Sequence, residues 1–401
     1  MSSGRSAQQV VVVGASLAGL SAAAELRQRG FEGSITIVGA ERHLPYDRPP
    51  LSKQFLQGRV DEAATALDLP PDLDLHWILG EAATGLDLSR RVARIAGAEE
   101  LHFDSLVIAT GAVPRELPLR QPPEGVHTLR TLDDAMALRA AVAEGGPVAV
   151  IGGGIIGLEV AASCRSLGLE VTVLEALGAP LIRALGPEMG AVCARLHSDH
   201  GVTIRVGVKV EALEGHPQLE AVRLADGSVV EARIAVVGVG VAPSTSWLDG
   251  SGVDVADGVC CDSSLRVLVG GRPLPGVVAA GDVARWPHPR YGDVRLEHWT
   301  NASEQGAAAA RTLLDGEDAA AYGAVPYFWS DQFDAKIQLV GLAAPGDAVQ
   351  VVEGSPEERR FAAVYGRHGE VVAAIGFNKA KSVMALKGDV ATGAPFPLES
   401  R

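Results

Sequence analysis

Short apolar runs alternate with a helical pattern along the first forty residues of the chain. Residues 10–13 are four consecutive valines, the kind of run that a buried parallel strand shows. An alanine-rich pattern over residues 20–29 predicts a helix that Gly30 ends, and residues 34–38 predict a second strand. The turn at residues 14–19, Gly-Ala-Ser-Leu-Ala-Gly, joins the first strand to the helix. This order predicts a strand–helix–strand unit that binds a nucleotide at its glycine turn.

The same pattern returns further along the chain. Residues 148–151 predict a strand, Gly-Gly-Gly-Ile-Ile-Gly follows at 152–157, and a helix is expected through Leu167. A second strand then leads to Glu175, as the second strand of the first copy leads to Glu41. An acid at this place can hold ribose hydroxyls. Two copies predict two dinucleotide sites, and hence an enzyme that passes electrons between two bound dinucleotides.

The remaining patterns outline three domains. Residues 106–109 and 277–280 read as buried strands that end at Thr110-Gly111 and at Gly281-Asp282, so the chain is expected to return to its first domain. Near the C-terminus, residues 361–365 and 371–375 flank a hairpin signal, Gly-Arg-His-Gly. We therefore predict three domains: 1–114 with 244–324, then 115–243, then a small α+β domain at 325–401.

Composition narrows the function classes. The 401 residues are 47% hydrophobic and 21% charged, which is ordinary for a globular protein. A net charge of −14 argues against broad binding to nucleic acid or to membrane surfaces. No apolar run reaches the length of about 20 residues that spans a bilayer. Residues 1–9 do not resemble a signal peptide, so we expect a cytoplasmic protein.

The four cysteines indicate neither a disulfide nor a metal site. None forms a CxxC pair, and no cluster of cysteine and histidine has metal-ligand spacing. Cys164 and Cys193 lie in helical patterns and are expected in the core. Cys260 and Cys261 are neighbours, and a plain strand is favoured there because a vicinal disulfide is strained.

Several charged or aromatic residues have two interpretations each. Lys53 follows a proline-rich stretch, and Ser52 or a neighbour can cap what comes next. The stretch is either a rigid surface connector or a wall of a flavin site. Glu159 is expected in the first turn of its helix, favoured there by the helix dipole, or facing a nicotinamide and paired with Lys53. Asp282 is either a helix cap or an acceptor for a ribityl hydroxyl. Trp329 is either core packing or a wall beside a cofactor.

Taken together, these motifs resemble those of the FAD-dependent ferredoxin reductases of bacterial cytochrome P450 and aromatic-ring dioxygenase systems. The resemblance covers nearly the whole chain. Its most specific pieces are the following: residues 46–53 (YDRPPLSK), 109–111 (ATG), 151–159 (IGGGIIGLE), 280–282 (AGD) and 329–332 (WSDQ). It implies an α/β fold of glutathione-reductase type, with two Rossmann-like dinucleotide-binding domains and a C-terminal interface domain.

The resemblance also implies roles for individual residues. Lys53, Glu159 and Trp329 are implied in catalysis. The expected FAD-binding residues are Gly14, Ser16, Ala18, Gly19, Glu41, Arg48, Lys53, Ala83, Thr110, Gly111, Arg130, Asp282 and Trp299. The expected NAD-binding residues are Gly152, Gly154, Ile156, Gly157, Glu159, Glu175, Arg183 and Gly240. Ala176 rather than a basic residue follows Glu175, which favours NADH over NADPH, although Arg183 downstream is either a phosphate contact or a solvated charge.

Two positions depart from the family pattern. Ser16 stands at the second glycine of the first turn, where the backbone should approach the pyrophosphate. Ala40 stands where many relatives carry an acid, which leaves Glu41 as the candidate for the adenosine ribose. Serine is small, and its hydroxyl can donate to phosphate, so FAD binding is still expected.

The implied activity is electron transfer from NADH through tightly bound, non-covalent FAD, one electron at a time, to a [2Fe–2S] ferredoxin or a rubredoxin that feeds an oxygenase. A monomer or weak dimer is expected. Acidic ferredoxin is expected to dock on cations near the C-terminal domain, namely Arg285, Arg290, Arg295, Lys379 and Lys381. The alternatives are an NADH oxidase or quinone reductase, and a redox-gated interaction protein that resembles apoptosis-inducing factor. A disulfide reductase is disfavoured because it needs a cysteine pair beside the flavin.

Overall fold

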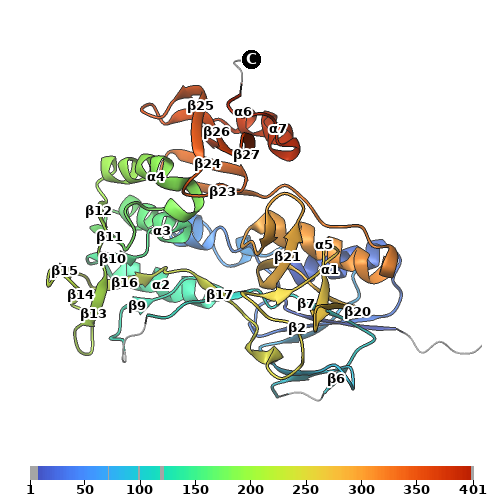
Figure 1. The fold of residues 1–401 in the computed structure, drawn as a ribbon. Helices are drawn as coiled ribbons and strands as arrows, with labels where there is room; N and C mark the ends of the chain where they lie inside the picture. The colour runs from blue at the N-terminus through green and yellow to red at the C-terminus, as the bar shows by residue number, and fades with distance from the viewer. Residues whose placement is uncertain (1–7, 71, 98–99, 118–121, 399–401) are drawn as a thin grey trace, which may run out of the picture. The chain divides into compact units, whose positions relative to one another are not determined.

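The computed structural model describes residues 8–70, 72–97, 100–117 and 122–398 (Figure 1). Compactness divides the chain into two units. The first unit comprises residues 1–47, 66–113 and 242–324, and the second comprises 48–65, 114–241 and 325–401. Strands β8 (Ala112–Pro114) and β17 (Val241–Pro243) lie where the chain passes from one unit to the other. The three-domain division stays a prediction, and the signal-peptide expectation rests mostly on residues outside the described part.

A six-stranded sheet forms the centre of the first unit, in the order β19-β20-β7-β1-β2-β3. All its neighbouring pairs are parallel except β19 with β20. The strands are β1 (Gln9–Val13), β2 (Ser34–Gly39), β3 (His76–Leu79), β7 (Ser105–Ile108), β19 (Arg266–Val269) and β20 (Arg272–Ala279). The four valines of β1 are buried, as a strand at the centre of a parallel sheet requires.

Two helices pack together in this unit. Helix α1 (Leu17–Gln28) follows β1, and α5 (Trp299–Asp315) contacts it closely through Gly306, where a Cβ would lie 2.3 Å from the carbonyl oxygen of Ala18. The helix predicted at 20–29 is present and begins three residues earlier than expected, at Leu17. Small residues at the crossing allow the two backbones to approach.

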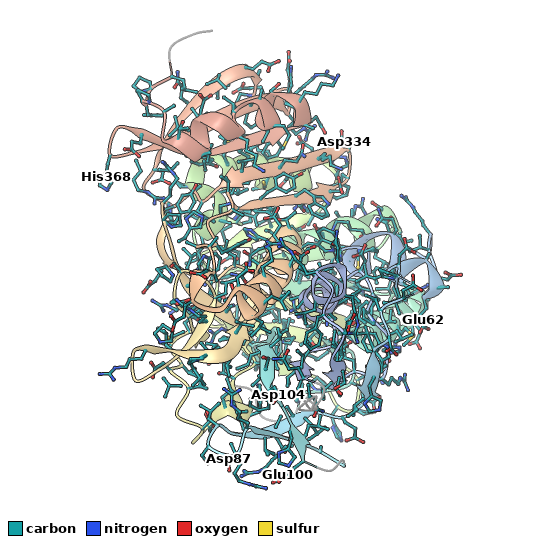
Figure 2. All side chains as sticks on the ribbon, turned by 90° about the vertical axis from the view of Figure 1, so that its right-hand side faces the viewer. Glu62, Asp87, Glu100, Asp104, Asp334 and His368 are labelled. Carbon is teal, nitrogen blue, oxygen red and sulfur yellow. The ribbon has the colours of Figure 1, made fainter. Side chains whose placement is uncertain are left out.

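Two small sheets complete the first unit. One has the order β4-β5-β6 and the other β18-β21-β22. Their strands are β4 (Ala83–Asp87), β5 (Val92–Ile95), β6 (Leu101–His102), β18 (Val259–Cys260), β21 (Ala284–His288) and β22 (Gly292–Val294). The acids Asp87 and Glu100, labelled in Figure 2, lie on the first of these, where Glu100 pairs with Arg90 at 2.7 Å. Short 3-10 turns lie at Ser246–Leu248, Gly281–Val283 and Gly316–Asp318.

The second unit contains a five-stranded parallel sheet in the order β12-β11-β10-β16-β9. Its strands are β9 (Val126–His127), β10 (Val148–Ile151), β11 (Val171–Glu175), β12 (Thr203–Val206) and β16 (Ile234–Val237), and its helices are α2 (Leu132–Glu144), α3 (Ile155–Ser166) and α4 (Ile182–Asp199). Thr131 and Asp134 form a capping box at the start of α2. A three-stranded antiparallel sheet lies beside them, with β13 (Val210–Glu214), β14 (Ala221–Leu224) and β15 (Val229–Glu231).

The C-terminal part of the same unit is a five-stranded antiparallel sheet, β23-β24-β27-β26-β25, with two short helices against it (Figure 1). Its elements are β23 (Tyr327–Gln332), β24 (Ala335–Gly341), β25 (Ala348–Ser355), β26 (Arg360–Arg367), β27 (Glu370–Phe377), α6 (Ala380–Ala385) and α7 (Lys387–Thr392). The predicted hairpin is confirmed, since Arg367 pairs with Glu370 across a turn whose two residues, His368 and Gly369, both have positive φ. The small α+β character expected for this region follows.

The described residues contain no helix long and apolar enough to cross a membrane. The cysteines lie as expected: Cys164 and Cys193 are fully buried in helices, and Cys260 ends strand β18 with its thiol free.

Candidate functional site

The first glycine turn, in the first unit, has no room for a side chain at either of its two glycines. Gly14 has a φ of +125°, and a Cβ there would lie 2.0 Å from the carbonyl oxygen of Ala109 at the end of β7. A Cβ on Gly19 would lie 1.9 Å from the carbonyl oxygen of Gly14. Strand β1, helix α1 and the end of β7 thus approach one another so closely that only glycine fits, which brings backbone N–H groups to the start of the helix.

Ser16 is the N-cap of α1, and it fits this turn without strain. Its φ of −116° is an extended conformation that any residue adopts, and its hydroxyl makes no capping bond to the helix. No acidic side chain lies in the first turn of α1. The positive end of the helix dipole therefore meets no carboxylate of its own, and Ser16 keeps a hydroxyl at the position where an anion would bind.

Three strands of this sheet end side by side at the turn. In the order β20-β7-β1, Ala279 pairs with Ile108, and Ile108 pairs with Val13. The carboxyl ends of parallel strands form the edge where ligands bind in open α/β sheets. Thr110 and Gly111 follow β7, and the Thr110 hydroxyl donates to the carbonyl of Ser244 at 2.7 Å.

Asp282 lies at the same edge, directly after β20. It falls inside the 3-10 turn Gly281–Val283, and α5 is capped by His298, so the cap interpretation of Asp282 is wrong. The buried amide of Gln305 on α5 accepts a hydrogen bond from the N–H of Gly281 at 2.8 Å. Gln305, which the sequence analysis missed, therefore fixes the backbone that carries Asp282.

Of the other residues expected to bind FAD, some lie in the first unit and some in the second. In the first unit, Glu41 follows β2 and accepts from the Tyr46 hydroxyl, while the indole N–H of Trp299 donates to Asp47 at 2.8 Å. Ala83 begins β4 and is half-buried against Ile95. Arg48 and Arg130 lie in the second unit.

A hydrogen bond links these two arginines: the Arg48 guanidinium donates to the backbone carbonyl of Arg130, just before α2.

The second glycine turn repeats the close approach of the first. A Cβ on Gly152 would lie 2.3 Å from the carbonyl oxygen of Gly238, and a Cβ on Gly157 would lie 2.2 Å from that of Gly152. Gly154 caps α3, and no acid lies in the first turn of that helix. This turn, too, presents backbone N–H groups at a positive helix end.

Glu175 at the end of β11 is held by the backbone of this turn. Its two oxygens accept hydrogen bonds from the N–H of Gly153 and the N–H of Leu177, each at 2.7 Å. The carboxylate is thereby fixed beside the glycines, and each oxygen keeps a lone pair for a further donor. Three other residues expected at this site, Ile156, Arg183 and Gly240, are exposed to solvent.

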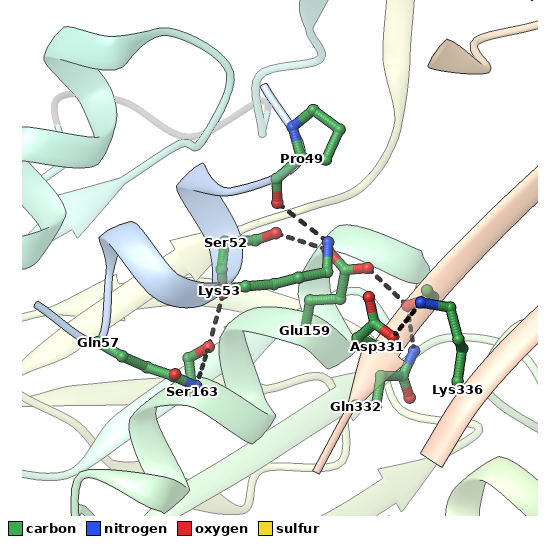
Figure 3. A network of polar contacts seen from close by, with 10 residues as sticks. Pro49, Ser52, Lys53, Gln57, Glu159, Ser163, Asp331, Gln332 and Lys336 are labelled. Atoms are coloured by element: carbon green, nitrogen blue, oxygen red, sulfur yellow. Dashed lines mark hydrogen bonds and ion pairs between the residues drawn. The ribbon is translucent and has the colours of Figure 1, made fainter. Parts of the chain in front are cut away.

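Lys53 and Glu159 form a buried ion pair within the second unit (Figure 3). The Lys53 Nζ donates to Glu159 Oε2 at 2.6 Å and to the carbonyl of Pro49 at 3.0 Å. The Ser52 hydroxyl donates to the same Oε2 at 2.5 Å and caps no helix, so its predicted capping role is wrong. The predicted pairing of Lys53 with Glu159 is present in the structure.

The first-turn interpretation of Glu159 is wrong. Helix α3 begins at Ile155, which places Glu159 one turn inside the helix, beyond the reach of the strongest dipole effect. Its other carboxylate oxygen, Oε1, accepts from the Ser330 hydroxyl at 2.5 Å. Glu159 is only 4% exposed, and its charge is compensated by these hydroxyl groups and by Lys53.

Trp329 and Ser330 lie on strand β23, which runs against α3. The strand alternates, so that Phe328, Ser330 and Gln332 are buried while Trp329 is half-buried on the opposite face, where its ring stacks on that of Tyr327. Sequence reasoning missed Ser330 and Gln332. The signal was present, since two polar residues at buried positions of one strand require partners.

His197 of α4 continues this polar cluster. Its Nε2 lies 2.9 Å from Gln332 Oε1, while Gln332 Nε2 donates to the Ser330 hydroxyl at 3.0 Å. Because an amide oxygen only accepts, the hydrogen lies on Nε2. Burial lowers the pKa of His197 to about 4, so the imidazole is neutral near pH 7.

Comparisons with known proteins agree with this architecture. A model of the pyridine nucleotide-disulphide oxidoreductase family matches residues 8–306, and a reductase C-terminal model matches residues 327–400. Rhodocoxin reductase of Rhodococcus erythropolis is 36% identical over 398 residues, with 97% of this chain and 91% of that protein covered. The ferredoxin–NAD(+) reductase component of the biphenyl dioxygenase system of Paraburkholderia xenovorans is 37% identical over 344 residues, covering 85% and 83%.

Among solved structures, the covalent complex of putidaredoxin reductase with putidaredoxin matches with a TM-score of 0.90 at 31% identity, covering 97% of this chain and 94% of that one. The chain belongs to the pyridine nucleotide-disulphide oxidoreductase family and is an oxidoreductase. The family resemblance and the fold class predicted from the motifs are confirmed.

Membership of this family implies a flavin and a pyridine nucleotide. The residues present fit two such groups. Gly14 and Gly19 in the first turn and Gly152 and Gly157 in the second leave no room for a Cβ, and both helices that follow begin without an acid. An acid comes next along the sheet in each case, Glu41 after β2 and Glu175 at the end of β11. These are the features that a dinucleotide pyrophosphate and its ribose require.

Proposed function

We propose that this chain is an NADH-dependent flavoprotein reductase that passes electrons from NADH through FAD to a small iron–sulfur protein of the ferredoxin type, which feeds an oxygenase. The observation that carries this proposal is the pair of glycine turns, each with two glycines whose positions leave no room for a Cβ. When bound, FAD supplies two-electron acceptance from NADH and release of single electrons. Relatives named as ferredoxin–NAD(+) reductase components of dioxygenase systems support ferredoxin as the acceptor.

In this proposal the first unit holds FAD. The N–H groups at the start of α1 and the Ser16 hydroxyl bind the pyrophosphate, with Gly14, Ala18 and Gly19 allowing the close approach. Glu41 binds the adenosine ribose, and Asp282 accepts from the ribityl chain. The other proposed FAD contacts are Arg48, Lys53, Ala83, Thr110, Gly111, Arg130 and Trp299. Many non-covalent contacts of this kind support tight binding.

The second glycine turn holds NADH in this proposal. Gly152, Gly154 and Gly157 surround its pyrophosphate, and the fixed carboxylate of Glu175 binds the adenosine ribose. A carboxylate there repels a 2′-phosphate, which favours NADH over NADPH. Ile156, Arg183 and Gly240 complete the site from exposed positions.

Lys53, Glu159 and Trp329 are the residues that we propose to act on the reaction. Lys53 presents positive charge to the reduced flavin, Glu159 holds the Lys53 ammonium in place at 2.6 Å, and Trp329 lies on the nicotinamide side of the flavin. No side chain has to accept a proton in the hydride step. The protein contributes alignment and charge.

Ferredoxin docking is proposed at cations that carry acidic partners in the free protein. Arg295 pairs with Glu297 at 2.8 Å, Arg285 with Asp293 at 3.5 Å, and Lys379 with Glu353. An acidic ferredoxin would replace these carboxylates by its own. Arg290→Glu and Lys379→Glu should each raise the KM for ferredoxin, whereas Lys209→Glu, at an exposed position outside this set of cations, should leave it unchanged. An unchanged KM in the first two variants would contradict this docking surface.

Anaerobic stopped-flow absorbance tests the function itself. Mixing the yellow protein with NADH should bleach the flavin band, and adding a [2Fe–2S] ferredoxin should restore it as the ferredoxin is reduced. Recovery only with oxygen or a quinone would establish an oxidase or quinone reductase instead. A rubredoxin in the second syringe tests the other acceptor.

A further inference from the structure

A network of donors converges on the carboxylate of Glu159 from three segments of the second unit (Figure 3). Ser52 and Lys53 donate to Oε2 from the segment 48–65, and Ser330 donates to Oε1 from β23. All four residues are less than 9% exposed. A buried carboxylate with a missing donor is costly, so its position depends on all three partners.

Ser330 is itself held in one orientation. Its oxygen accepts from Gln332 Nε2 at 3.0 Å, and Gln332 Oε1 accepts from His197 Nε2 at 2.9 Å. The Ser330 hydrogen can then point only toward Glu159 Oε1. The donors thus run in one direction, from His197 on α4 through Gln332 and Ser330 to Glu159.

The alternation of β23 connects this chain of donors to Trp329. Ser330 and Gln332 point to the buried face of the strand, whereas Trp329, next to Ser330, occupies the opposite face. The Ser330–Glu159 bond therefore fixes the position of β23, which carries Trp329, along α3, which carries Glu159. One hydroxyl positions two of the three residues proposed to act on the reaction.

We propose that Ser330 is a positioning residue, oriented by Gln332, that sets the Glu159 carboxylate and through it the Lys53 ammonium for electron transfer from NADH to FAD. This inference rests on the proposed function and deepens it. Ser330 touches neither cofactor in the proposal. Its effect is on the geometry of the Lys53–Glu159 pair, and hence on the rate of flavin reduction rather than on NADH affinity.

Ser330→Thr and Ser330→Val test the inference as a matched pair. The two new side chains have almost the same shape, and only threonine keeps the hydroxyl. Ser330→Val removes one of the three donors to the buried carboxylate, so it should lower the limiting rate of flavin reduction at saturating NADH about tenfold relative to Ser330→Thr. The dissociation constant for NADH should change less than twofold in both.

Thr65→Val serves as the control. The Thr65 hydroxyl belongs to a buried residue and donates to the carbonyl of Glu62 at 2.7 Å, but it makes no bond to Ser52, Lys53 or Glu159. This variant should lose stability and keep a limiting rate within about twofold of the parent protein. A tenfold loss in the control would show that any buried hydroxyl has this effect and would overturn the positioning role.

Equal limiting rates for Ser330→Val and Ser330→Thr would also overturn it. If Ser330→Val does not retain FAD, Gln332→Met is used in its place. This second variant removes the donor that orients the Ser330 hydroxyl, and it leaves both Ser330 and Glu159 unchanged. It should lower the limiting rate about threefold, and an unchanged rate would overturn the inference. A parent protein that NADH does not bleach would refute the proposed function instead, which separates the two failures.

Discussion

The Tyr365 hydroxyl donates a hydrogen bond to the carbonyl oxygen of Leu185 at 2.8 Å. Tyr365 lies on β26 and is fully buried, and Leu185 lies in α4 just before a break at Gly186, whose φ is +75°, and Pro187. The C-terminal sheet therefore supplies a hydrogen-bond donor to the last carbonyl before the break in α4.

Tyr365→Phe should destabilise the protein by about 1–3 kcal/mol, because it leaves the Leu185 carbonyl buried without a donor. Urea unfolding followed by tryptophan fluorescence measures the change. Tyr327→Phe removes a hydroxyl that accepts from Gln338 at a half-buried position, and it should cost less. Equal losses in the two variants would show that the break in α4 does not need Tyr365.

Lys53→Met should destabilise the protein by about 3 kcal/mol, since it leaves Glu159 as a buried charge without its ion-pair partner. Combining it with Glu159→Gln should recover part of this loss. Lys336→Met is the matched control, because the Lys336–Asp331 pair at 3.4 Å is half exposed and should be worth less than about 1 kcal/mol. The free energy of unfolding of the four proteins is measured with urea. Equal losses in Lys53→Met and Lys336→Met would contradict this prediction.

Gly14→Ala should yield a protein without bound flavin, because the added Cβ would meet the Ala109 carbonyl oxygen at 2.0 Å and push the turn apart. The ratio of absorbance at the flavin band to that of the protein measures occupancy. Gly30→Ala introduces alanine at another positive φ, +81°, with nothing within 4 Å. That control should cost about 1–2 kcal/mol and keep the flavin. Flavin retention in Gly14→Ala would contradict the assignment of the turn.

Glu175→Gln should raise the dissociation constant for NADH about tenfold, since an amide offers one acceptor oxygen where the carboxylate offers two. The N–H groups of Gly153 and Leu177 would then compete for that oxygen. Binding is measured by flavin reduction at increasing NADH. The exposed Glu170→Gln removes the same charge nearby and should leave binding unchanged. An unaffected Glu175→Gln would place the ribose elsewhere.

Acid should weaken the fold through His197. The folded-state pKa of about 4 lies below the ordinary value of 6.5, so the unfolded chain binds the proton more tightly. The contribution of neutral His197 is complete above pH 6.5 and is lost as the pH falls toward 4. Between pH 7 and pH 5, protonation linked to this single group should lower the free energy of unfolding by about 2 kcal/mol.

The matched measurement for that loss is His197→Asn. Between pH 7 and pH 5, the free energy of unfolding of this variant should fall by about 2 kcal/mol less than that of the parent protein. Parallel pH dependences in the two proteins would show that His197 does not titrate in this range.

The glycine turns could be predicted from the sequence because the information is local. Gly14, Gly152 and the acids Glu41 and Glu175 lie within one strand–helix–strand unit each, and their spacing follows from the length of those elements. The hairpin at His368 was predictable for the same reason. The motifs identified the family, and the family implied the partners of these turns.

The network around Glu159 could be predicted only in part. The pairing with Lys53 was one of the two interpretations that the sequence left open for Glu159, whereas Ser330, Gln332 and His197 approach from segments far apart in the chain. Nothing local selects Ser330 as the donor to Glu159, since that contact depends on how β23 packs on α3. Helix α3 begins at Ile155 rather than after Gly157, and this earlier start places Glu159 beyond the first turn of the helix.

The pairing of β7 with β20 sets the order in which the chain can fold during synthesis. Leu106 pairs with Val277, and the helix that packs on α1 begins only at Trp299. The five-stranded parallel sheet of the second unit, by contrast, lies wholly between Val126 and Val237. On the ribosome that sheet can close while β7 still has an unpaired edge, so the first glycine turn, where we propose that FAD binds, is completed only after α5 has been translated.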